Sequence, residues 1–562
     1  MLVRCALSII LVGSCLGQNL KRMDQIVASY VADQKFMGAV LVARGRDLVF
    51  SKGYGLANLE WDIPNSPETK FRIGSITKQF TAASILLLEE RGKLKVSDPL
   101  RKYLPEAPAA WDKVTIFHLL THTSGIPDDT ESRDWDTFAP LLTTHAAFFE
   151  RFRGRPLDFE PGNREYYDNS GYALLGCLIE KVSGVEYGTF IRENLFTPLG
   201  MKDSGLVSTT AVIPRLASGY ARGKGNFEYA HPVYASVYEG AGALYSTTGD
   251  LLRWESGLFG GQVLSTASLE KMTTPFKNNY AFGLVIRTYR GQKVIGHSGS
   301  LEGVATQLDY YPADKLTVAV LGNMHRASSA EIARLLARLA HGEPVKLQTE
   351  RREVPIDPKR LARYIGAYQL SSGGKLLITT EDNHLLNTPE NQAPATFFPE
   401  SERSFFRKGV DEQIEFAADT TSSHANQLVL HREEGDTTAN RLDESEFRRL
   451  SDVAARAAVR YKEQRPFPGS ETALQKIIND LRSGLPDYDM MRPGLAAAIR
   501  GQMIQLQTLI SERGSIQSVS FREVGPAGPD VYVARGEKGS LECQIWLAPD
   551  GKVAGLNFRR LQ

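Results

Sequence analysis

The sequence predicts an α+β protein of several domains, and three observations support this prediction. The chain has 562 residues, 42% of them hydrophobic, which suggests about three or four domains. Strand-like segments stand at both ends of residues 22–343, with helical segments between them. Beyond residue 343 the chain turns to prolines and short strands, and then to further helices and strands. The first part is therefore expected to be an antiparallel sheet flanked by helices, with a helical insertion.

The predicted first domain covers residues 22–343. Its strands are expected where β-branched and aromatic residues run between turn signals. Residues 100–275 are expected to form helices and long loops. If both ends of the domain join in one sheet, residues 75, 167 and 297 meet where sheet and insertion join, which is a usual place for a ligand cleft. The expected strands are 39–43, 48–50, 282–286, 304–310 and 316–321, and a helix over 328–341 closes the domain.

Residues 1–17 have the pattern of a secretory signal. A short charged start precedes an apolar run that ends at Gly13 and is too short for a permanent membrane helix. Cleavage after Gly17 would make Gln18 the mature N-terminus, so the protein is expected to be secreted or periplasmic. A second interpretation makes Cys15 the acylated cysteine of a lipoprotein. No later apolar run reaches the roughly 20 residues of a transmembrane helix.

Composition argues against several other classes of protein. With 66 basic and 65 acidic side chains, the chain has no strong net field to attract nucleic acid. Cys177 and Cys543 lie in different predicted domains, so a disulfide framework is not expected. We find no G-x-S-x-G, Walker-type loop or cysteine cluster, and we expect no cofactor and no metal. His118 and His122 have the spacing of a helical zinc pair but lack its glutamate, so a structural role is expected.

Ser75 and Lys78 open a predicted buried helix and form the first candidate catalytic pair. Positions three apart share a helix face, so the amine can take the hydroxyl proton and activate the serine. Burial lowers the pKa of a lysine, which a base requires. The helix is expected to begin at the serine, where its dipole favours an anion, and to end at Gly92. Further S-x-x-K copies at Ser268 and Ser372 are expected in an exposed helical turn and a hairpin, without a buried lysine.

Two further motifs follow in the chain. Residues 167–169 read Tyr-Asp-Asn, the only Y-x-N present, and residues 297–299 read His-Ser-Gly after a strand-like run. Together with S-x-x-K, and in this order, they resemble the penicillin-recognising serine hydrolases: class C β-lactamases, D-alanyl-D-alanine carboxypeptidases, D-aminopeptidases and related esterases. Residues 115–127 and 242–251 also resemble stretches common in that superfamily. The resemblance covers residues 22–343 and implies a β-lactamase/transpeptidase-like fold.

The resemblance implies a role for each motif residue. Ser75 would be the acylated nucleophile and Lys78 its base. Tyr167, if its phenol is partly ionised beside Lys78, would relay protons to the leaving group and later activate the deacylating water. Asn169 would bind Lys78 and the acyl amide of the substrate. The backbone N–H groups of Ser75 and Ser300 would form the oxyanion hole, typically worth about 10²–10³ in rate per donor.

The third motif departs from the β-lactamase pattern, in which a lysine stands at the position of His297. An unperturbed histidine is mostly neutral at pH 7, so recognition of a substrate carboxylate is expected to be weaker. Ser298 can still offer a hydroxyl, and Gly299 completes the motif. We therefore expect an exported serine hydrolase that acts on small esters, amides or D-amino-acid peptides. The alternatives are a true β-lactamase, or an acyl-trapping or inactive penicillin-binding protein that works through its C-terminal domains.

Residues 128–160 are rich in acidic and aromatic side chains. If this segment overhangs the cleft, it would favour cationic or aromatic substrate groups. The alternative is an ordinary solvated loop.

The rest of the chain is expected to form further domains. Residues 350–442 have short strands with turn signals and look like a small β-barrel domain, and residues 443–466 form a helical linker. Residues 467–562 have two helical runs, strands around Val519, Val531 and Ile545, and a hairpin turn at 548–552. This last part resembles a cystatin-like or NTF2-like α+β domain. It is expected to pack against the enzyme or to bind a protein partner.

Overall fold

The computed structural model describes residues 18–561, apart from 133, 142–143, 209, 234–237, 391, 418–422, 433–434 and 549. The expected signal, with Cys15, lies outside the described residues. The chain divides into two compact units between Val345 and Lys346. Within the described part of the chain, no helix combines the length and the apolarity needed to cross a membrane.

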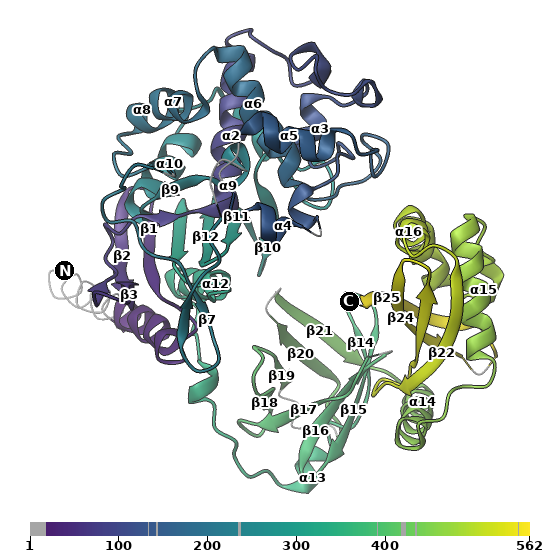
Figure 1. Cartoon of the computed structure of the whole chain (residues 1–562). Coiled ribbons are helices and arrows are strands. Elements are labelled where there is room, and N and C mark those ends of the chain that lie inside the picture. The colour runs from purple at the N-terminus through teal and green to yellow at the C-terminus, as the bar shows by residue number, and fades with distance from the viewer. Residues whose placement is uncertain are drawn as a thin grey trace, which may run out of the picture. The chain divides into compact units, whose positions relative to one another are not determined.

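A six-stranded antiparallel sheet forms the frame of the first unit (Figure 1). Its order is β10-β11-β12-β13-β1-β2, so the two ends of this unit meet where β1 pairs with β13. The sequence predicted this joining of distant strands. The strands are β1 (Gly38–Arg44), β2 (Asp47–Tyr54), β10 (Val285–Tyr289), β11 (Gln292–Leu301), β12 (Val304–Tyr311) and β13 (Leu316–Gly322).

Both faces of the central strands are buried, which explains their continuous apolar sequences. Neighbouring residues of a strand point to opposite faces. Ala39 and Leu41 of β1 belong to the core that also contains the helix after Ser75, whereas Val40 and Val42 point the other way and are buried too. Helices α10 (Thr248–Phe259) and α12 (Ser329–Ala340) both contact β13.

One expected strand begins later than the sequence suggested. Residues 282–284 were expected to be extended, but β10 begins at Val285. Gly283 has a φ of +67°, in the left-handed region, and a Cβ there would lie 2.4 Å from the carbonyl oxygen of Lys78. This close approach to the backbone of Lys78 excludes a regular strand at that point.

Helix α2 (Thr77–Glu90) runs through the middle of the first unit. Its residues from Thr77 to Leu88 are all buried, as expected of a helix that is apolar on every side. One buried polar side chain of the helix, Gln79, accepts a hydrogen bond at Oε1 from Trp254 Nε1 at 2.8 Å. The helix ends just before Gly92, which has a φ of +67°.

Shorter helices and small sheets surround α2. The other helices of the first unit are residues 18–32, α3 (Ile116–Leu120), α4 (Trp135–Phe138), α5 (His145–Arg153), α6 (Asn169–Ser183), α7 (Tyr187–Ile191), α8 (Thr197–Leu199), α9 (Glu239–Gly242) and α11 (Thr266–Thr273). The small strands are β3 (Leu56–Asn58), β4 (Ile63–Pro64), β5 (Phe71–Arg72), β6 (Gly205–Leu206), β7 (Tyr220–Arg222), β8 (Phe227–Tyr229) and β9 (Leu244–Ser246).

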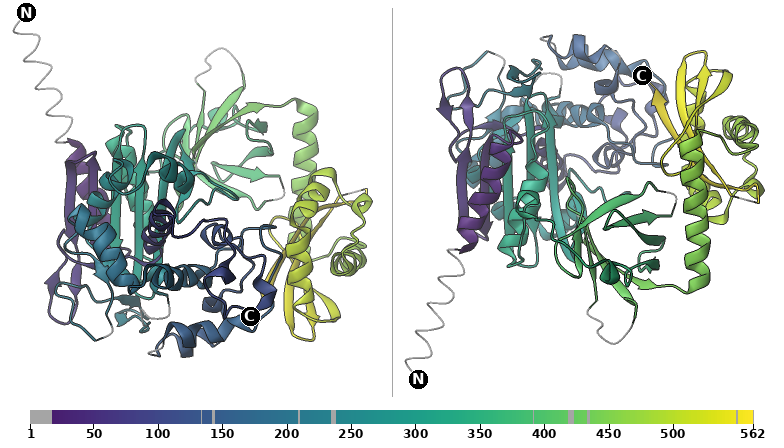
Figure 2. Two further views of the ribbon diagram at one scale, coloured as in Figure 1. Left: turned by 90° about the horizontal axis from the view of Figure 1, so that it is seen from above. Right: turned by 90° about the horizontal axis from the view of Figure 1, so that it is seen from below.

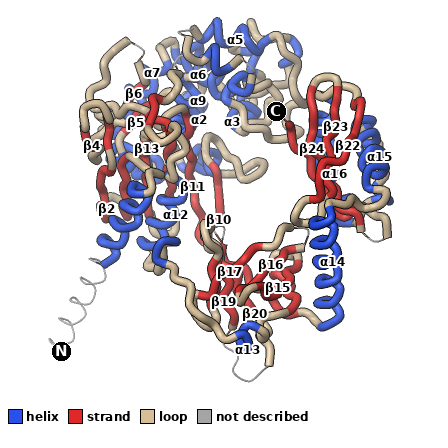
Figure 3. Tube along the Cα trace, turned by 60° about the horizontal axis from the view of Figure 1, so that its bottom comes forward, coloured by secondary structure: helices blue, strands red, loops and turns tan. Residues whose placement is uncertain are grey.

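The second unit starts with a closed eight-stranded antiparallel barrel (Figure 3). Aromatic side chains fill its interior, among them Tyr368, Phe397 and Phe416, so the barrel encloses a packed core. A short helix, α13 (Pro358–Leu361), precedes it. The strands are β14 (Gly366–Leu370), β15 (Lys375–Glu381), β16 (His384–Pro389), β17 (Ala395–Pro399), β18 (Ser404–Phe406), β19 (Gln413–Phe416), β20 (Gln427–Arg432) and β21 (Gly435–Arg441).

A long helix, α14 (Glu444–Glu463), follows the barrel and contacts both β14 and the C-terminal sheet (light green in Figure 2). The last part of the chain is α+β. Helix α15 packs Leu474 and Ile477 against Cys543 and Ile545 of a four-stranded antiparallel sheet. Its elements are α15 (Ser470–Ser483), α16 (Pro493–Ser511), β22 (Ile516–Val524), β23 (Asp530–Gly536), β24 (Gly539–Leu547) and β25 (Val553–Leu561).

Candidate active site

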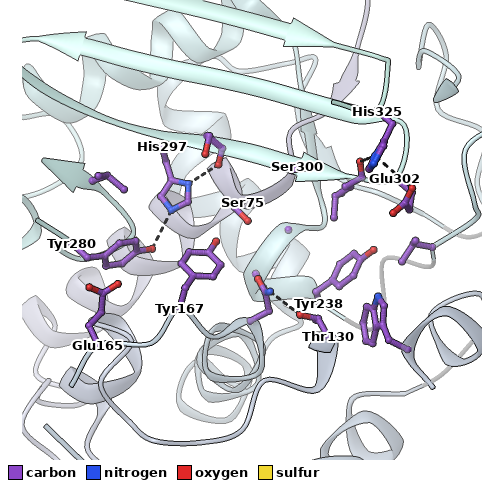
Figure 4. Close-up of a pocket in the computed structure, with 18 of the residues that line it drawn as sticks. Ser75, Thr130, Glu165, Tyr167, Tyr238, Tyr280, His297, Ser300, Glu302 and His325 are labelled. Atoms are coloured by element: carbon purple, nitrogen blue, oxygen red, sulfur yellow. Dashed lines mark hydrogen bonds and ion pairs between the residues drawn. The ribbon is translucent and has the colours of Figure 1, made fainter. Parts of the chain in front are cut away.

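A cleft of about 720 Å³ lies where the sheet meets the helical insertion (Figure 4). The structure brings the predicted site residues together here, although they come from three distant parts of the sequence. Lys78 is fully buried behind the wall of the cleft, and Gly299 is a buried part of β11. The predicted residues that line the cleft are Ser75, Tyr167, Asn169, His297, Ser298 and Ser300.

The amine of Lys78 is held by three acceptors. Its Nζ lies 3.1 Å from Ser75 Oγ, 2.8 Å from Asn169 Oδ1 and 2.9 Å from the carbonyl oxygen of Ala241. The amide of Asn169 is oriented by its other end, since Nδ2 donates to the Asp128 carboxylate at 3.2 Å. Asn169 Oδ1 and the Ala241 carbonyl can only accept. A neutral amine donates its two N–H groups to them and turns its lone pair toward the Ser75 hydroxyl.

Burial lowers the pKa of Lys78 to about 7, against the opposing charges of Asp128 and Asp168. Removing water disfavours the ammonium, while the two carboxylates favour it. About half of the lysine is therefore neutral near pH 7. An amine in this state at hydrogen-bonding distance can act as the base for Ser75.

Two glycines allow Ser75 to approach strand β11. Ser75 lies in the 3₁₀ turn η1 (Gly74–Ile76), and α2 begins directly after this turn at Thr77, two residues later than expected. Gly74 has a φ of +55°, and a Cβ there would lie 3.0 Å from the amide nitrogen of Ser300. A Cβ on Gly299 would lie 2.0 Å from the carbonyl oxygen of Ile73. The amide nitrogens of Ser75 and Ser300 are thus neighbours in space, and their role as an oxyanion hole stays a prediction.

Tyr167 and Asn169 are positioned by the start of helix α6. Asp168 caps this helix by accepting from the N–H of Gly171 at 3.0 Å. The N–H of Asp168 donates to Nδ1 of buried His122 at 3.1 Å, so this histidine has a structural role. This capping role of the Asp168 carboxylate was not predicted from the sequence, although aspartate is a typical helix N-cap residue.

The surroundings of Tyr167 oppose the partial ionisation on which its relay role was conditional. Burial raises its pKa well above the usual value, and the charges of Asp128 and Asp168 raise it further. The neutral phenol hydrogen-bonds Ser75, and the Lys78 Nζ lies 4.7 Å from the centroid of its ring. A neutral phenol in this place can donate a proton.

His297 is held in one neutral form. Its Nδ1 lies 2.6 Å from the Ser298 carbonyl oxygen, which can only accept, so this nitrogen carries the proton. Its Nε2 then accepts from the hydroxyl of Tyr280 at 3.1 Å. Burial, with the charge of Lys78, lowers the pKa of His297 to about 3. The histidine cannot provide a positive charge to the cleft at neutral pH.

The segment 128–160 contributes to the wall of the cleft through Thr130 and Trp135. Two of its acids form ion pairs with Arg151, which lies 2.5 Å from Asp129 and 2.8 Å from Asp134. One part of the segment thus lines the cleft, and another part carries acidic side chains that form ion pairs.

Two acidic residues in the cleft were missed at the level of the sequence. Glu165 and Glu302 both line it. Each stands two positions from a predicted site residue, Tyr167 and Ser300 respectively. In an extended backbone such positions share a face, and this was the signal that could have identified them.

Comparison with known proteins identifies the family. A family model described as Beta-lactamase matches residues 23–342. Penicillin-binding protein 4* of Bacillus subtilis (strain 168) is 29% identical over 447 residues, covering 75% of this chain and 98% of that protein.

Solved structures agree with this match. A penicillin-binding protein from Bacillus halodurans is 31% identical with a TM-score of 0.50, over 56% of this chain and 98% of that one. An octameric penicillin-binding protein homologue from Pyrococcus abyssi is 27% identical with a TM-score of 0.53, over 75% and 99% of the two chains. The expected β-lactamase/transpeptidase-like fold is confirmed. The chain belongs to the Beta-lactamase family and is a hydrolase of that family.

Proposed function

We propose that the protein hydrolyses small esters, amides or D-amino-acid peptides through an acyl-enzyme on Ser75. The observation that carries this proposal is the Lys78 amine, 3.1 Å from Ser75 Oγ and with its pKa lowered to about 7. A serine hydroxyl becomes a good nucleophile when such a base is in place.

The geometry supports a sequence of proton transfers. Neutral Lys78 takes the proton of Ser75 as its oxygen attacks the substrate carbonyl. The oxyanion then accepts hydrogen bonds from the N–H groups of Ser75 and Ser300. Tyr167 gives its proton to the leaving group and regains one from Lys78. Water attacks the acyl-enzyme by the same route in reverse, which regenerates Ser75.

The charges of the cleft favour esters and amides over penicillins. A penicillin carries a carboxylate, which a cation would hold. His297 is neutral, and the described residues that line the cleft include no lysine or arginine. Binding of a carboxylate therefore lacks its usual partner.

A second candidate function rests on the relatives. Penicillin-binding protein 4* is named for binding penicillin. If penicillin acylates Ser75 of this chain and is not released, the protein would trap the acyl group instead of turning it over.

We also propose that the protein acts outside the cytoplasm. The charged start and apolar run of residues 1–17 support a secretory signal. Cell fractionation with an antibody tests this, because an uncleaved protein found only in the cytoplasm would contradict it.

A single kinetic comparison distinguishes the candidate functions. The purified protein is mixed with a chromogenic ester and, separately, with a chromogenic cephalosporin, and bursts and steady rates are followed. We expect steady ester turnover that Ser75→Ala abolishes, with slow or no cephalosporin turnover. A stoichiometric burst without turnover would support acyl trapping. Cephalosporin turnover as fast as ester turnover would identify a true β-lactamase.

A further inference from the structure

The charged side chains that line the cleft are negative, and the proposed catalytic reaction does not explain why. Among the described residues that line it, Glu165 and Glu302 are acidic and none is a lysine or arginine. Lys78 lies behind the wall of the cleft, and its amine is engaged with Ser75, Asn169 and Ala241. A charged substrate therefore meets carboxylates on entering.

The two carboxylates lie at opposite ends of the cleft. In Figure 4, Glu165 lies beyond Tyr167, next to Tyr280, whereas Glu302 lies past Ser300 on the far side of Ser75. The charge of Glu165 helps to raise the pKa of Tyr280, as expected of close neighbours. Tyr167 is the proton donor for the leaving group, so the leaving group must lie on the Tyr167 side. Glu165 therefore faces the leaving group, and Glu302 faces the acyl part.

Glu165 is not neutralised by its surroundings. Its Oε2 is buried and has no hydrogen-bond partner within the described part of the chain, and the side chain hydrogen-bonds Asn278. Lys277, the cation beside Asn278, donates to the carbonyl oxygens of Gly162 and Asn163, at 2.7 Å each. The guanidinium of Arg164 lies over the ring of Phe159, 4.5 Å from its centroid.

Glu302 differs in this respect. Its carboxylate lies 3.5 Å from Nδ1 of His325, which also lines the cleft. The acyl end of the cleft thus has a carboxylate with a partner, and the leaving-group end has one without.

We propose that Glu165 selects the leaving group by charge, so that the preferred substrates release an alcohol or amine that carries an ammonium group. This inference rests on the proposed function, because it assigns a substrate class to the same acyl-enzyme reaction. An ammonium held in the cleft beside Glu165 would be attracted by the charge of this carboxylate, which has no cation paired with it among the described residues. A carboxylate on the leaving group would instead meet like charge in a partly desolvated place. The protein would accordingly be a poor carboxypeptidase, since the amine released by a carboxypeptidase bears a carboxylate.

Three esters test the proposal. They share one acyl group and have phenol leaving groups of matched pKa that carry a trimethylammonium, a neutral or a carboxylate substituent. We expect kcat/KM to fall in that order, with a cation-to-anion ratio of about 10² or more, from attraction and repulsion combined. Glu165→Gln should reduce the ratio at least tenfold. A ratio near one in the unaltered protein, or a ratio that Glu165→Gln leaves unchanged, would overturn the proposal.

Glu302→Gln is the matched control. It removes the same charge from the acyl end, so it should leave the leaving-group ratio within about twofold. If Glu302→Gln reduced the ratio as much as Glu165→Gln does, the selection could not be assigned to Glu165. Thermal denaturation of both variants shows whether either loses its fold.

A binding measurement separates this proposal from the proposed function. The trimethylammonium phenol is titrated into the Ser75→Ala protein by calorimetry, with the carboxylate phenol as reference. We expect the cation to bind at least tenfold more tightly, and Glu165→Gln to remove that difference. If no ester is hydrolysed but this preference is found, the proposed function fails while the charge selection stands. If esters are hydrolysed and neither phenol is preferred, the charge selection fails alone.

Discussion

The Nζ of Lys78 lies 2.8 Å from Oδ1 of Asn169, a residue 91 positions further along the chain. Helices α2 and α6 pack together and bring the two side chains to one point. Residues of two helices therefore fix the position of the amine. Its position does not depend on the rotamer of Lys78 alone. Asn169 also donates a hydrogen bond to Asp128, which fixes the amide that orients the Lys78 amine. The charge of Asp128 in turn favours the protonated form of Lys78.

Acylation should depend on pH through Lys78. Its pKa is about 7 and the neutral form is the base, so a fall in pH protonates the amine and slows the reaction. About a tenth of the amine is neutral at pH 6 and about nine-tenths at pH 8. The burst rate with an activated ester, measured between pH 5 and 9, should rise with a midpoint near pH 7 and level above about pH 8. Lys78→Met should slow the burst by about 10²–10⁴ and flatten the profile. A burst that is unchanged in this variant removes Lys78 from the mechanism.

Removing the charge of Asp128 should move this pH profile. The carboxylate stabilises the ammonium of Lys78, so Asp128→Asn lowers the pKa of Lys78. The midpoint of the burst rate is expected to shift to lower pH by about half a unit to one unit. Asp134→Asn is the control, because Asp134 is largely exposed, pairs with Arg151, and should leave the midpoint in place. A midpoint that rises in Asp128→Asn would show that the carboxylate does not act on the lysine in this way.

Tyr167→Phe should slow the release of poor leaving groups most. The phenol is neutral, and its proton is needed when the leaving group is a strong base. Hydrolysis of an anilide is expected to fall by about 10²–10⁴, and hydrolysis of a nitrophenyl ester by less than about tenfold. Tyr166→Phe serves as the control, since Tyr166 donates to Glu131 at 2.7 Å at an exposed site. Equal losses for the anilide and the ester would argue against proton donation by Tyr167.

Gly299→Ala should harm both stability and activity. Its Cβ would lie 2.0 Å from the carbonyl oxygen of Ile73 and 2.3 Å from Thr306 Oγ1, so β11 and the turn that holds Ser75 must separate. The free energy of unfolding should fall by about 1–3 kcal/mol, with a larger proportional loss of ester turnover. Gly154→Ala, at an exposed helix end with no atom within 4 Å, should change stability by less than about 0.5 kcal/mol. Chemical denaturation and steady-state rates measure both effects.

Much of the fold could be predicted because its signals are local. The apolar run of β1 and the helical spacing from Phe80 to Leu88 indicate buried elements wherever they occur. The late start of β10 could not be predicted, because Gly283 is held in the left-handed region by its approach to the Lys78 carbonyl, a contact between distant segments.

The sequence by itself determined which groups are candidates for the chemistry. The spacing of Ser75 and Lys78 is a property of one helical turn, and the Tyr-Asp-Asn and His-Ser-Gly motifs are short continuous stretches of sequence. Only the tertiary structure decided their protonation. Burial keeps the phenol of Tyr167 and the ring of His297 neutral, and it leaves Oε2 of Glu165 without a hydrogen-bond partner among the described residues. Desolvation depends on everything packed around a group, and no short stretch of sequence contains that information.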